Sequence, residues 1–462
     1  MTLETILESK RTLVARARRE RPLAGLLDGL NASDRDFAAA LRRPRTGFVL
    51  EHKRRSPSAG TLREGADPAD VARAYAPFAD AISVLTDATF FGGSLADLRR
   101  VRESVELPVL RKDFVVEPYQ VVEARAAGAD AVLLMLSVLD DGLWLACAAA
   151  ATECRMATLT EVHTATELER ALKLDAPIIG INSRDLHTLL VDRGVIERLA
   201  PRVPADRVVV AESGFRTHAD VLGLRDHADA FLVGTTLMRA GQLEGAVRRL
   251  VFGDVKICGL TRAADARAAW KAGATWGGLV FAAESPRQVD VPTARDVRSA
   301  APLRWAGVFV NEQPERIARI VRELQLDAAQ LHGEETPAHV AAVRRSLPDG
   351  CEVWKAVRVS NDRTPPRLTA TGADRLLLDA HRPQARGGTG ERFEWSVAAA
   401  HPDRKRVILA GGLTPDNVPI ADAVGVGLLD VSSGVEQAPG VKSRTRLDAF
   451  FGALRGGERT RA

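Results

Sequence analysis

Short apolar runs alternate with longer amphipathic segments along almost the whole chain. Each run is followed by a polar or glycine-containing turn and then by a segment long enough for a helix. Eight such runs lie before residue 252, at 48–53, 81–85, 108–113, 131–136, 157–162, 177–182, 207–212 and 229–233. This alternation is typical of parallel β-strands joined by helical crossovers.

The pattern then starts again and gives a second set of eight runs. They lie at 254–258, 276–281, 304–310, 327–331, 352–357, 374–379, 405–410 and 426–431. Eight strand–helix units favour a closed (β/α)8 barrel, and an open doubly wound sheet is the alternative. We therefore predict an α/β fold of two tandem (β/α)8 TIM barrels, with domains at residues 1–252 and 253–462. Residues 1–46 predict an N-terminal helical extension that caps a barrel mouth.

Composition narrows the possible functions. The 462 residues are 46% hydrophobic, which is enough apolar material for two cores. A net charge of +4, and basic stretches without interleaved aromatic residues, argue against nucleic-acid binding. No apolar run is long enough to predict a membrane span. The four cysteines have no metal-ligand spacing and predict no disulfide framework, which favours a reducing cytoplasm.

Charged and polar side chains end five strands of the first barrel. They are Glu51, Lys53, Lys112, Glu161, Asn182 and Glu212. Because strand alternation points them inward and the carboxyl ends of barrel strands meet at one mouth, we expect them in a single cavity. Ammonium and carboxylate groups placed this closely shift each other's pKa values, as catalytic groups require. The alternative is a purely structural ring of ion pairs, which is a costly use of buried charge.

Other strand ends suit phosphate binding and acid–base chemistry. Ser213–Gly214 and Gly234 follow the seventh and eighth strands of the first barrel, where exposed backbone N–H groups bind phosphate. In the second barrel, Cys258 ends the first strand and Asp379 ends the sixth. Each has a structural alternative, a buried thiol for Cys258 and a helix N-cap for Asp379. Together they predict a base and an acid on opposite sides of one substrate.

The first barrel resembles indole-3-glycerol-phosphate synthase along nearly its whole length. The motifs that carry the resemblance are EHKRRSPS (51–58), LTDATFFGGS (85–94), VLRKDF (109–114), TEVH (160–163), INSRDL (181–186), AESG (211–214) and FLVGT (231–235). The resemblance implies ring closure of a carboxyphenylamino-deoxyribulose phosphate with loss of CO2 and water.

The resemblance also implies roles for individual residues. Lys112 is expected to be the general acid, with Glu161 as its acid–base partner. Lys53 is expected to hold the substrate carboxylate and to serve in dehydration, oriented by Glu51. The residues expected to position the substrate or bind its phosphate and aromatic ring are Asn182, Glu212, Ser56, Arg184, Ser213, Gly214, Gly234, Phe91 and Phe114. His52 is expected to point away from the mouth.

The second barrel resembles phosphoribosylanthranilate isomerase, again over its whole length. The motifs are KICGLT (256–261), FAAESPRQV (281–289), GVFV (307–310), QLHG (330–333), LLLDA (376–380), GGTGERFEW (387–395), LAGGLTPDNV (409–418) and DVSSGVEQAPGVK (430–442). The resemblance implies an Amadori rearrangement in which Asp379 protonates the furanose oxygen and Cys258 removes the C2′ proton. Arg287 is expected to hold the anthranilate carboxylate, and the expected phosphate ligands are Gly411, Gly412, Ser433 and Gly434.

The two resemblances lie in the order of the fused bacterial enzyme, and the isomerase product is the synthase substrate. We expect small phosphorylated anthranilate–sugar substrates, no cofactor, no metal and a monomeric protein in the cytoplasm. Two alternatives stay open. One is a single active barrel joined to a binding or scaffolding barrel, and the other is an unrelated sugar-phosphate enzyme such as a Schiff-base aldolase.

Overall fold

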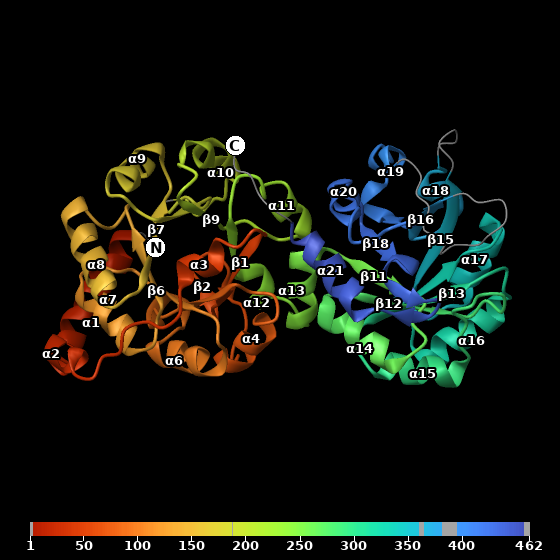
Figure 1. The fold of residues 1–462 in the computed structure, drawn as a ribbon, viewed down its shortest axis with the longest axis horizontal. Helices are drawn as coiled ribbons and strands as arrows, with labels where there is room; N and C mark the ends of the chain where they lie inside the picture. Colours follow the sequence, from red (N-terminus) through yellow and green to blue (C-terminus); the bar gives the residue numbers. More distant parts are fainter. Residues whose placement is uncertain (1–2, 187, 360–364, 381–394, 457–462) are drawn as a thin grey trace. The chain divides into compact units, whose positions relative to one another are not determined.

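The computed structural model describes residues 3–186, 188–359, 365–380 and 395–456. These residues form two compact units, one ending at Val251 and the other beginning at Phe252. Each unit contains a closed barrel of eight parallel strands with helices packed around it (Figure 1). Both TIM barrels are therefore confirmed, and the open-sheet alternative is wrong.

The first barrel closes where its last strand pairs with its first, through Gly47 opposite Ala230. The strands are β1 (Gly47–His52), β4 (Ala81–Leu85), β5 (Val109–Lys112), β6 (Ala131–Met135), β7 (Ala157–Val162), β8 (Ile178–Asn182), β9 (Val208–Glu212) and β10 (Ala230–Val233). The helices are α4 (Pro68–Tyr75), α5 (Ala88–Phe91), α6 (Leu95–Ser104), α7 (Tyr119–Ala126), α8 (Asp141–Glu153), α9 (Ala165–Lys173), α10 (Gly194–Leu199), the 3-10 turn η1 (Ala200–Arg202), α11 (His218–Leu222), α12 (Thr235–Met238) and α13 (Leu243–Phe252). A short hairpin of β2 (Arg55–Ser56) and β3 (Gly60–Thr61) was not apparent from the sequence.

The N-terminal extension is helical, as predicted, and reaches both ends of its barrel. It forms α1 (Leu3–Glu20), α2 (Leu23–Leu27) and α3 (Phe37–Leu41). Phe37 and Leu41 pack in one core cluster with Ala81 and Ala131, the first residues of β4 and β6, so α3 closes the end where the strands begin. The start of α1 instead borders the pocket at the opposite end, through Leu3 and Ile6. The extension therefore borders the pocket mouth through α1, as expected, and also closes the opposite end of the barrel through α3.

The second barrel closes through pairing of its first and last strands. The strands are β11 (Val255–Cys258), β12 (Trp276–Val280), β13 (Arg304–Phe309), β14 (Ala328–Leu331), β15 (Glu352–Val359), β16 (Arg375–Ala380), β17 (Val407–Leu409) and β18 (Leu428–Val431). The helices are α14 (Ala263–Ala272), α15 (Val291–Ser299), α16 (Pro314–Leu324), α17 (Pro337–Ser346), α18 (Leu368–Thr371), α19 (Ser396–Ala399), the 3-10 turns η2 (Arg404–Arg406) and η3 (Ser433–Val435), α20 (Val418–Ala423) and α21 (Arg444–Leu454). A hairpin of β19 (Glu436–Ala438) and β20 (Val441–Lys442) completes it.

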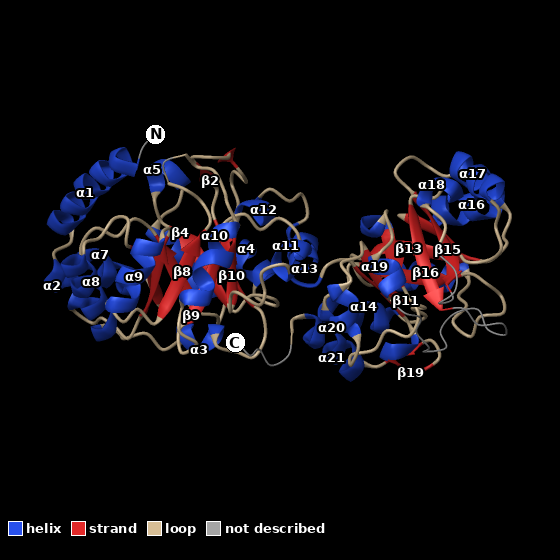
Figure 2. Cartoon of the chain, turned by 90° about the horizontal axis from the view of Figure 1, so that it is seen from above, coloured by secondary structure: helices blue, strands red, loops and turns tan. Residues whose placement is uncertain are grey.

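Large and small residues fill the second barrel together. The ring centroids of Trp276 and Trp354 lie 4.7 Å apart in the core. The small side chains of Ala306 and Ala328 in the same cluster leave room for these two indole rings. The strands occupy the centre of each unit and the helices its surface, seen from a second direction in Figure 2. This arrangement fixes the strand ends, and therefore the side chains just after them, at one rim.

All sixteen predicted strands match barrel strands in order, with ends that differ by a few residues. Residues 387–394 of the GGTGERFEW motif lie outside the described part of the chain. Within the described part, no helix is long and apolar enough to cross a membrane.

Candidate active sites

A pocket of about 1460 Å³ lies at the carboxyl ends of the first barrel's strands. The structure brings every predicted site residue of this barrel into its lining. They are Glu51, Lys53, Ser56, Phe91, Lys112, Phe114, Glu161, Asn182, Arg184, Glu212, Ser213, Gly214 and Gly234. Residues that are far apart in the sequence therefore meet around one cavity, as an active site requires.

Lys112 lies at the centre of the charged groups. Its Nζ is 3.1 Å from Glu161 Oε2 and 3.4 Å from Glu212 Oε2. Burial disfavours the charged ammonium, but the carboxylates of Glu161, Glu212 and Glu51 outweigh burial and raise the pKa of Lys112. Lys112 is therefore protonated at neutral pH and suited to donate a proton.

The two glutamates beside Lys112 are in different states. Burial raises the pKa of Glu212 well above its usual value, and the negative charge of Glu161 raises it further. For Glu161, burial is outweighed by the positive charges of Lys112 and His163, so its pKa lies below the usual value. The two pKa values are therefore shifted in opposite directions, as expected when two neighbouring acids share one cation.

A second ion pair lies at the end of β1, where Lys53 Nζ is 2.7 Å from Glu51 Oε1. Two glycines make room for the carboxylates. A Cβ on Gly234 would overlap the Glu51 side chain, and a Cβ on Gly180 would overlap Glu212. Gly234 is thus required for packing as well as being a predicted phosphate ligand.

Phe91 and Phe114 form an aromatic pair at the pocket, with ring centroids 6.3 Å apart. Each follows an aspartate that fixes the local backbone. Asp87 accepts a hydrogen bond from Phe90 N and begins α5, while Asp113 accepts one from Phe114 N. Both aromatic residues are therefore held on short, tethered segments.

The two aspartates are joined by Lys10 of α1, which the sequence reasoning missed. Lys10 Nζ lies 2.7 Å from Asp87 and 2.7 Å from Asp113, and all three side chains are buried. A lysine in an amphipathic helix usually faces solvent, so the sequence carries no signal for this contact.

Two histidines flank the charged strand ends. His52 is buried outside the pocket lining, as strand alternation predicts, and burial lowers its pKa to about 4. His163 lies 3.4 Å from Glu161 and 3.4 Å from Glu167. Burial opposes its charge, but its contacts with Glu167 and Glu161 outweigh burial and raise its pKa.

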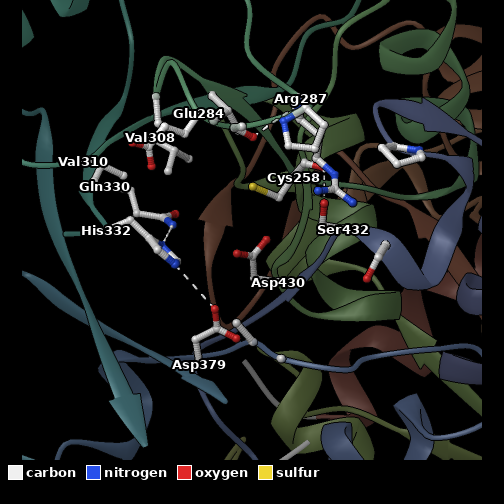
Figure 3. Close-up of a pocket in the computed structure, with 18 of the residues that line it drawn as sticks. Cys258, Glu284, Arg287, Val308, Val310, Gln330, His332, Asp379, Asp430 and Ser432 are labelled. Atoms are coloured by element: carbon white, nitrogen blue, oxygen red, sulfur yellow. Dashed lines mark hydrogen bonds and ion pairs between the residues drawn. The ribbon is translucent and has the colours of Figure 1, made fainter. Parts of the chain in front are cut away.

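The second barrel has a pocket of about 770 Å³ at the same end of its strands (Figure 3). Six of the predicted site residues line it: Cys258, Arg287, Asp379, Gly411, Gly412 and Ser433. Gly434 is not in the lining. A Cβ on Gly434 would overlap the carbonyl of Leu413, so this glycine allows two loops to approach closely.

Cys258 follows the buried Lys256 by two residues on β11. Lys256 is fully buried, with Nζ 2.9 Å from Asp430 and 2.8 Å from Gln330. Burial raises the pKa of the Cys258 thiol, and the positive charge of Lys256 opposes this increase. A Cβ on Gly278 would lie 3.0 Å from the sulfur, so the glycine opposite leaves space for the thiol.

Asp379 has a histidine as its neighbour. His332 Nε2 is 3.5 Å from Asp379 Oδ2, and Figure 3 shows the imidazole pointing toward the carboxylate. The other ring nitrogen of His332 lies 2.9 Å from Gln330 Nε2. His332 and Gln330 belong to the QLHG motif but were not among the predicted site residues.

Arg287 lines the pocket with its guanidinium held by Glu436. Its Nε and Nη2 lie 2.9 Å and 2.6 Å from the two oxygens of that carboxylate. Glu436 also binds Lys442 at 2.7 Å, so two cations surround one acid. The φ of Gly259 is +71°, and any side chain there would overlap Arg287. The predicted carboxylate ligand is thus preset in position by the protein.

Two of the turns predicted to bind phosphate contain consecutive residues with positive φ. Ser213 and Gly214 have φ values of +70° and +88°, and Gly411 and Gly412 have +80° and +73°. No group of three potential metal ligands occurs among the residues that the structure describes.

Comparison with known proteins agrees with both barrels. Residues 3–250 match the family model for indole-3-glycerol phosphate synthase, and residues 255–453 match that for N-(5'-phosphoribosyl)anthranilate isomerase. A tryptophan biosynthesis protein TrpCF of Yersinia pestis is 44% identical over 98% of this chain and 94% of its own length. The TrpCF protein of Vibrio cholerae is 45% identical over 98% and 96%.

Solved phosphoribosylanthranilate isomerases are among the proteins similar to part of this chain. The phosphoribosylanthranilate isomerase of Thermus thermophilus is 40% identical, covers 44% of this chain and 98% of its own, and has a TM-score of 0.39. The family models and the full-length relatives together cover both barrels in the same order. The chain therefore belongs to the TrpCF family of tryptophan-biosynthesis proteins, in which an indole-3-glycerol phosphate synthase precedes a phosphoribosylanthranilate isomerase.

Proposed function

We propose that the two pockets are the active sites of two consecutive reactions and assign a role to each residue. The second barrel isomerises N-(5-phosphoribosyl)anthranilate to 1-(2-carboxyphenylamino)-1-deoxyribulose 5-phosphate. The first barrel closes that product to indole-3-glycerol phosphate, releasing CO2 and water. The observation that carries the assignment is the gathering of the predicted acids and bases at one rim of each barrel.

In the synthase, Lys112 donates a proton to the ketone oxygen while the ring carbon that bears the carboxylate attacks the ketone carbon. Loss of CO2 then restores the aromatic ring. The hydroxyl group formed from the ketone leaves as water, with Lys53 and Glu161 serving the proton transfers of this dehydration. The position of Lys112 between two carboxyl groups supports its role, because it keeps the ammonium charged until substrate arrives.

The remaining synthase residues bind and orient the substrate. Glu51 orients Lys53, which holds the substrate carboxylate before it leaves as CO2. Phe91 and Phe114 pack on the aromatic ring. Asn182 and Glu212 position the sugar chain, and the phosphate and its surroundings are contacted by Ser56, Arg184, Ser213, Gly214 and Gly234.

In the isomerase, Asp379 gives its proton to the furanose oxygen, and the C1′–O bond breaks to form a Schiff base with the anthranilate nitrogen. Cys258 as thiolate removes the C2′ proton, which yields an enolamine that becomes the ketose. Arg287 holds the anthranilate carboxylate, and Gly411, Gly412, Ser433 and Gly434 form the phosphate turns. For Gly434 the support is indirect, through the close loop packing that it permits.

A Schiff-base aldolase is a weaker assignment. A lysine nucleophile must lose its proton, whereas the carboxylates raise the pKa of Lys112. We further propose that the protein is a monomer, to be checked by light scattering. Four free cysteines support a reducing compartment such as the cytoplasm.

The test is to separate the activities by mutation in the full-length protein. Cys258→Ala and Asp379→Asn are each expected to reduce isomerase turnover by at least ~100-fold and to leave the synthase unchanged. Lys112→Ala is expected to do the reverse. If one of these substitutions silenced both reactions in a folded protein, the assignment of two independent sites would be wrong.

A further inference from the structure

A chain of polar contacts joins the surroundings of Cys258 to those of Asp379 across the floor of the isomerase pocket. It runs from Lys256 to Gln330 at 2.8 Å, from Gln330 to His332 at 2.9 Å, and from His332 to Asp379 at 3.5 Å. Because Lys256 is fully buried, the near end of this chain is shielded from water. The chemistry of the four groups determines the direction of each contact.

A lysine ammonium has only hydrogens to offer, so it can face only an acceptor. The Gln330 atom that faces Lys256 is therefore the carbonyl oxygen, and the amide NH2 must face His332. An amide NH2 can only donate, so His332 Nδ1 must accept and carries no proton. The one proton of the imidazole then sits on Nε2, the atom that faces Asp379.

From this geometry we infer that His332 is a positioning residue that holds Asp379 for proton donation, and that Lys256, acting through Gln330, sets its neutral Nε2–H tautomer. The inference rests on the role proposed above for Asp379. An Nε2–H directed at Oδ2, 3.5 Å away, restricts the rotation of the Asp379 carboxyl group. A histidinium would instead favour the ionised carboxylate, which cannot protonate the furanose oxygen.

The other charged groups of the pocket have partners of their own. Arg358 lies 3.2 Å from Glu334, and Asp430 is paired with Lys256. Gln330 is thus the group that faces Nδ1, and Asp379 the one that faces Nε2.

Matched substitutions of His332 test the role of the donor. The amide of His332→Gln reaches the position of Nε2, whereas that of His332→Asn ends near Nδ1 and cannot contact Asp379. We expect His332→Asn to lower isomerase kcat by about tenfold or more with little change in KM, the effect of losing one hydrogen bond to a reacting group. His332→Gln is expected to stay within about threefold of the wild type. Equal activities for the two variants would overturn the inference.

The tautomer is measured directly by imidazole 15N shifts in protein labelled with 15N-histidine, with His332→Gln identifying the signal. At pH 7.5 the wild type should show the Nε2–H form, and an Nδ1–H or doubly protonated ring would contradict the inference. In Gln330→Glu a carboxylate faces Nδ1, so His332 should become doubly protonated and the alkaline limb of the isomerase pH profile should move to lower pH.

Failure of this inference and failure of the proposed function give different results. If Asp379→Asn abolishes isomerase activity while His332→Asn does not, Asp379 keeps its role and His332 has none. If Asp379→Asn retains activity, the proposed acid is wrong, whatever the tautomer. Synthase activity, measured on the same samples, should remain unchanged in every variant.

Discussion

Lys112 Nζ lies 3.1 Å from Glu161 Oε2, and the same ammonium lies 3.4 Å from Glu212. One buried cation therefore serves two carboxyl groups, and the pKa of Glu161 is lowered while that of Glu212 is raised. This difference makes the two glutamates unequal, although both end barrel strands and both line the same pocket.

Glu161→Gln and Glu212→Gln should therefore have different effects on the synthase. Removing the ionised partner of Lys112 is expected to lower kcat by at least ~100-fold, whereas Glu212→Gln, which resembles the protonated acid, should lower it by less than ~10-fold. Steady-state kinetics on the full-length protein measure both. Similar losses in the two variants would argue against these opposite pKa shifts.

The stability of Glu212→Gln should also depend less on pH. The pKa of Glu212 is higher in the folded protein than in the unfolded chain, where it is about 4.3. The protonated side chain therefore stabilises the fold below pH ~4.3. This stabilisation is lost as pH rises through the pKa of the folded state. The glutamine has no proton to lose. We expect the unfolding free energy of the variant, followed by urea titration from pH 5 to pH 8, to fall less than that of the wild type.

Lys10→Met should weaken the synthase barrel although Lys10 is not a substrate ligand. The substitution leaves Asp87 and Asp113 buried without the cation that joins them, which typically costs about 3–5 kcal/mol. We expect a lower melting temperature and a higher synthase KM, since both aspartates tether the phenylalanine pair. Arg16→Ala, which removes an exposed pair with Glu20 in the same helix, is the control and should leave the melting temperature almost unchanged.

His52 should make the synthase barrel sensitive to acid. Its folded pKa of about 4 is below the unfolded value of about 6.5, so the unfolded state binds the proton first and stability falls between pH 6.5 and pH 4. The difference corresponds to about 3 kcal/mol. His52→Leu should remove that part of the pH dependence, measured by hydrogen exchange of β1 amides. If the stability of His52→Leu and that of the wild type fell by the same amount between pH 6.5 and pH 4, the proposed contribution of His52 would be wrong.

Cys258 should react with iodoacetamide slowly at pH 7 and faster as pH rises, because burial raises the pKa of its thiol and the thiolate is the nucleophile. Cys147, whose pKa burial raises to about 12, is the internal control and should remain unmodified, as mass spectrometry can show. Modification should abolish isomerase activity and spare the synthase. Rapid, pH-independent labelling of Cys258 would show that the thiol is ionised at rest.

Exhaustive dialysis against EDTA should leave both activities unchanged. The proposed proton transfers use only side chains, and the residues that the structure describes contain no cluster of three potential metal ligands. Assays before dialysis and after re-addition of divalent cations make the comparison. If an activity were lost on dialysis and restored by a divalent cation, that reaction would require a metal ion, which the proposed mechanism does not include.

The two barrels, and most of the residues that line their pockets, were predictable from the sequence. Strand and helix periods are local properties, so the two sets of eight units could be read directly, and strand ends meet at one rim in any closed barrel. That rule predicts Glu51, Lys112 and Glu161 in one cavity, and all three line the same pocket. The phosphate turns followed from glycines just after the last two strands.

The partners of these groups could not be predicted, because they depend on how the elements pack in three dimensions. Lys10 is an ordinary helix residue until α1 packs over Asp87 and Asp113, and the QLHG motif does not reveal that Gln330 bridges Lys256 and His332. Likewise, two equally buried glutamates have pKa values shifted in opposite directions, because Lys112 lies closer to Glu161 and His163 contacts Glu161 as well. Hydrogen-bond direction and pKa depend on distances between atoms that are remote in sequence, and only folding fixes those distances.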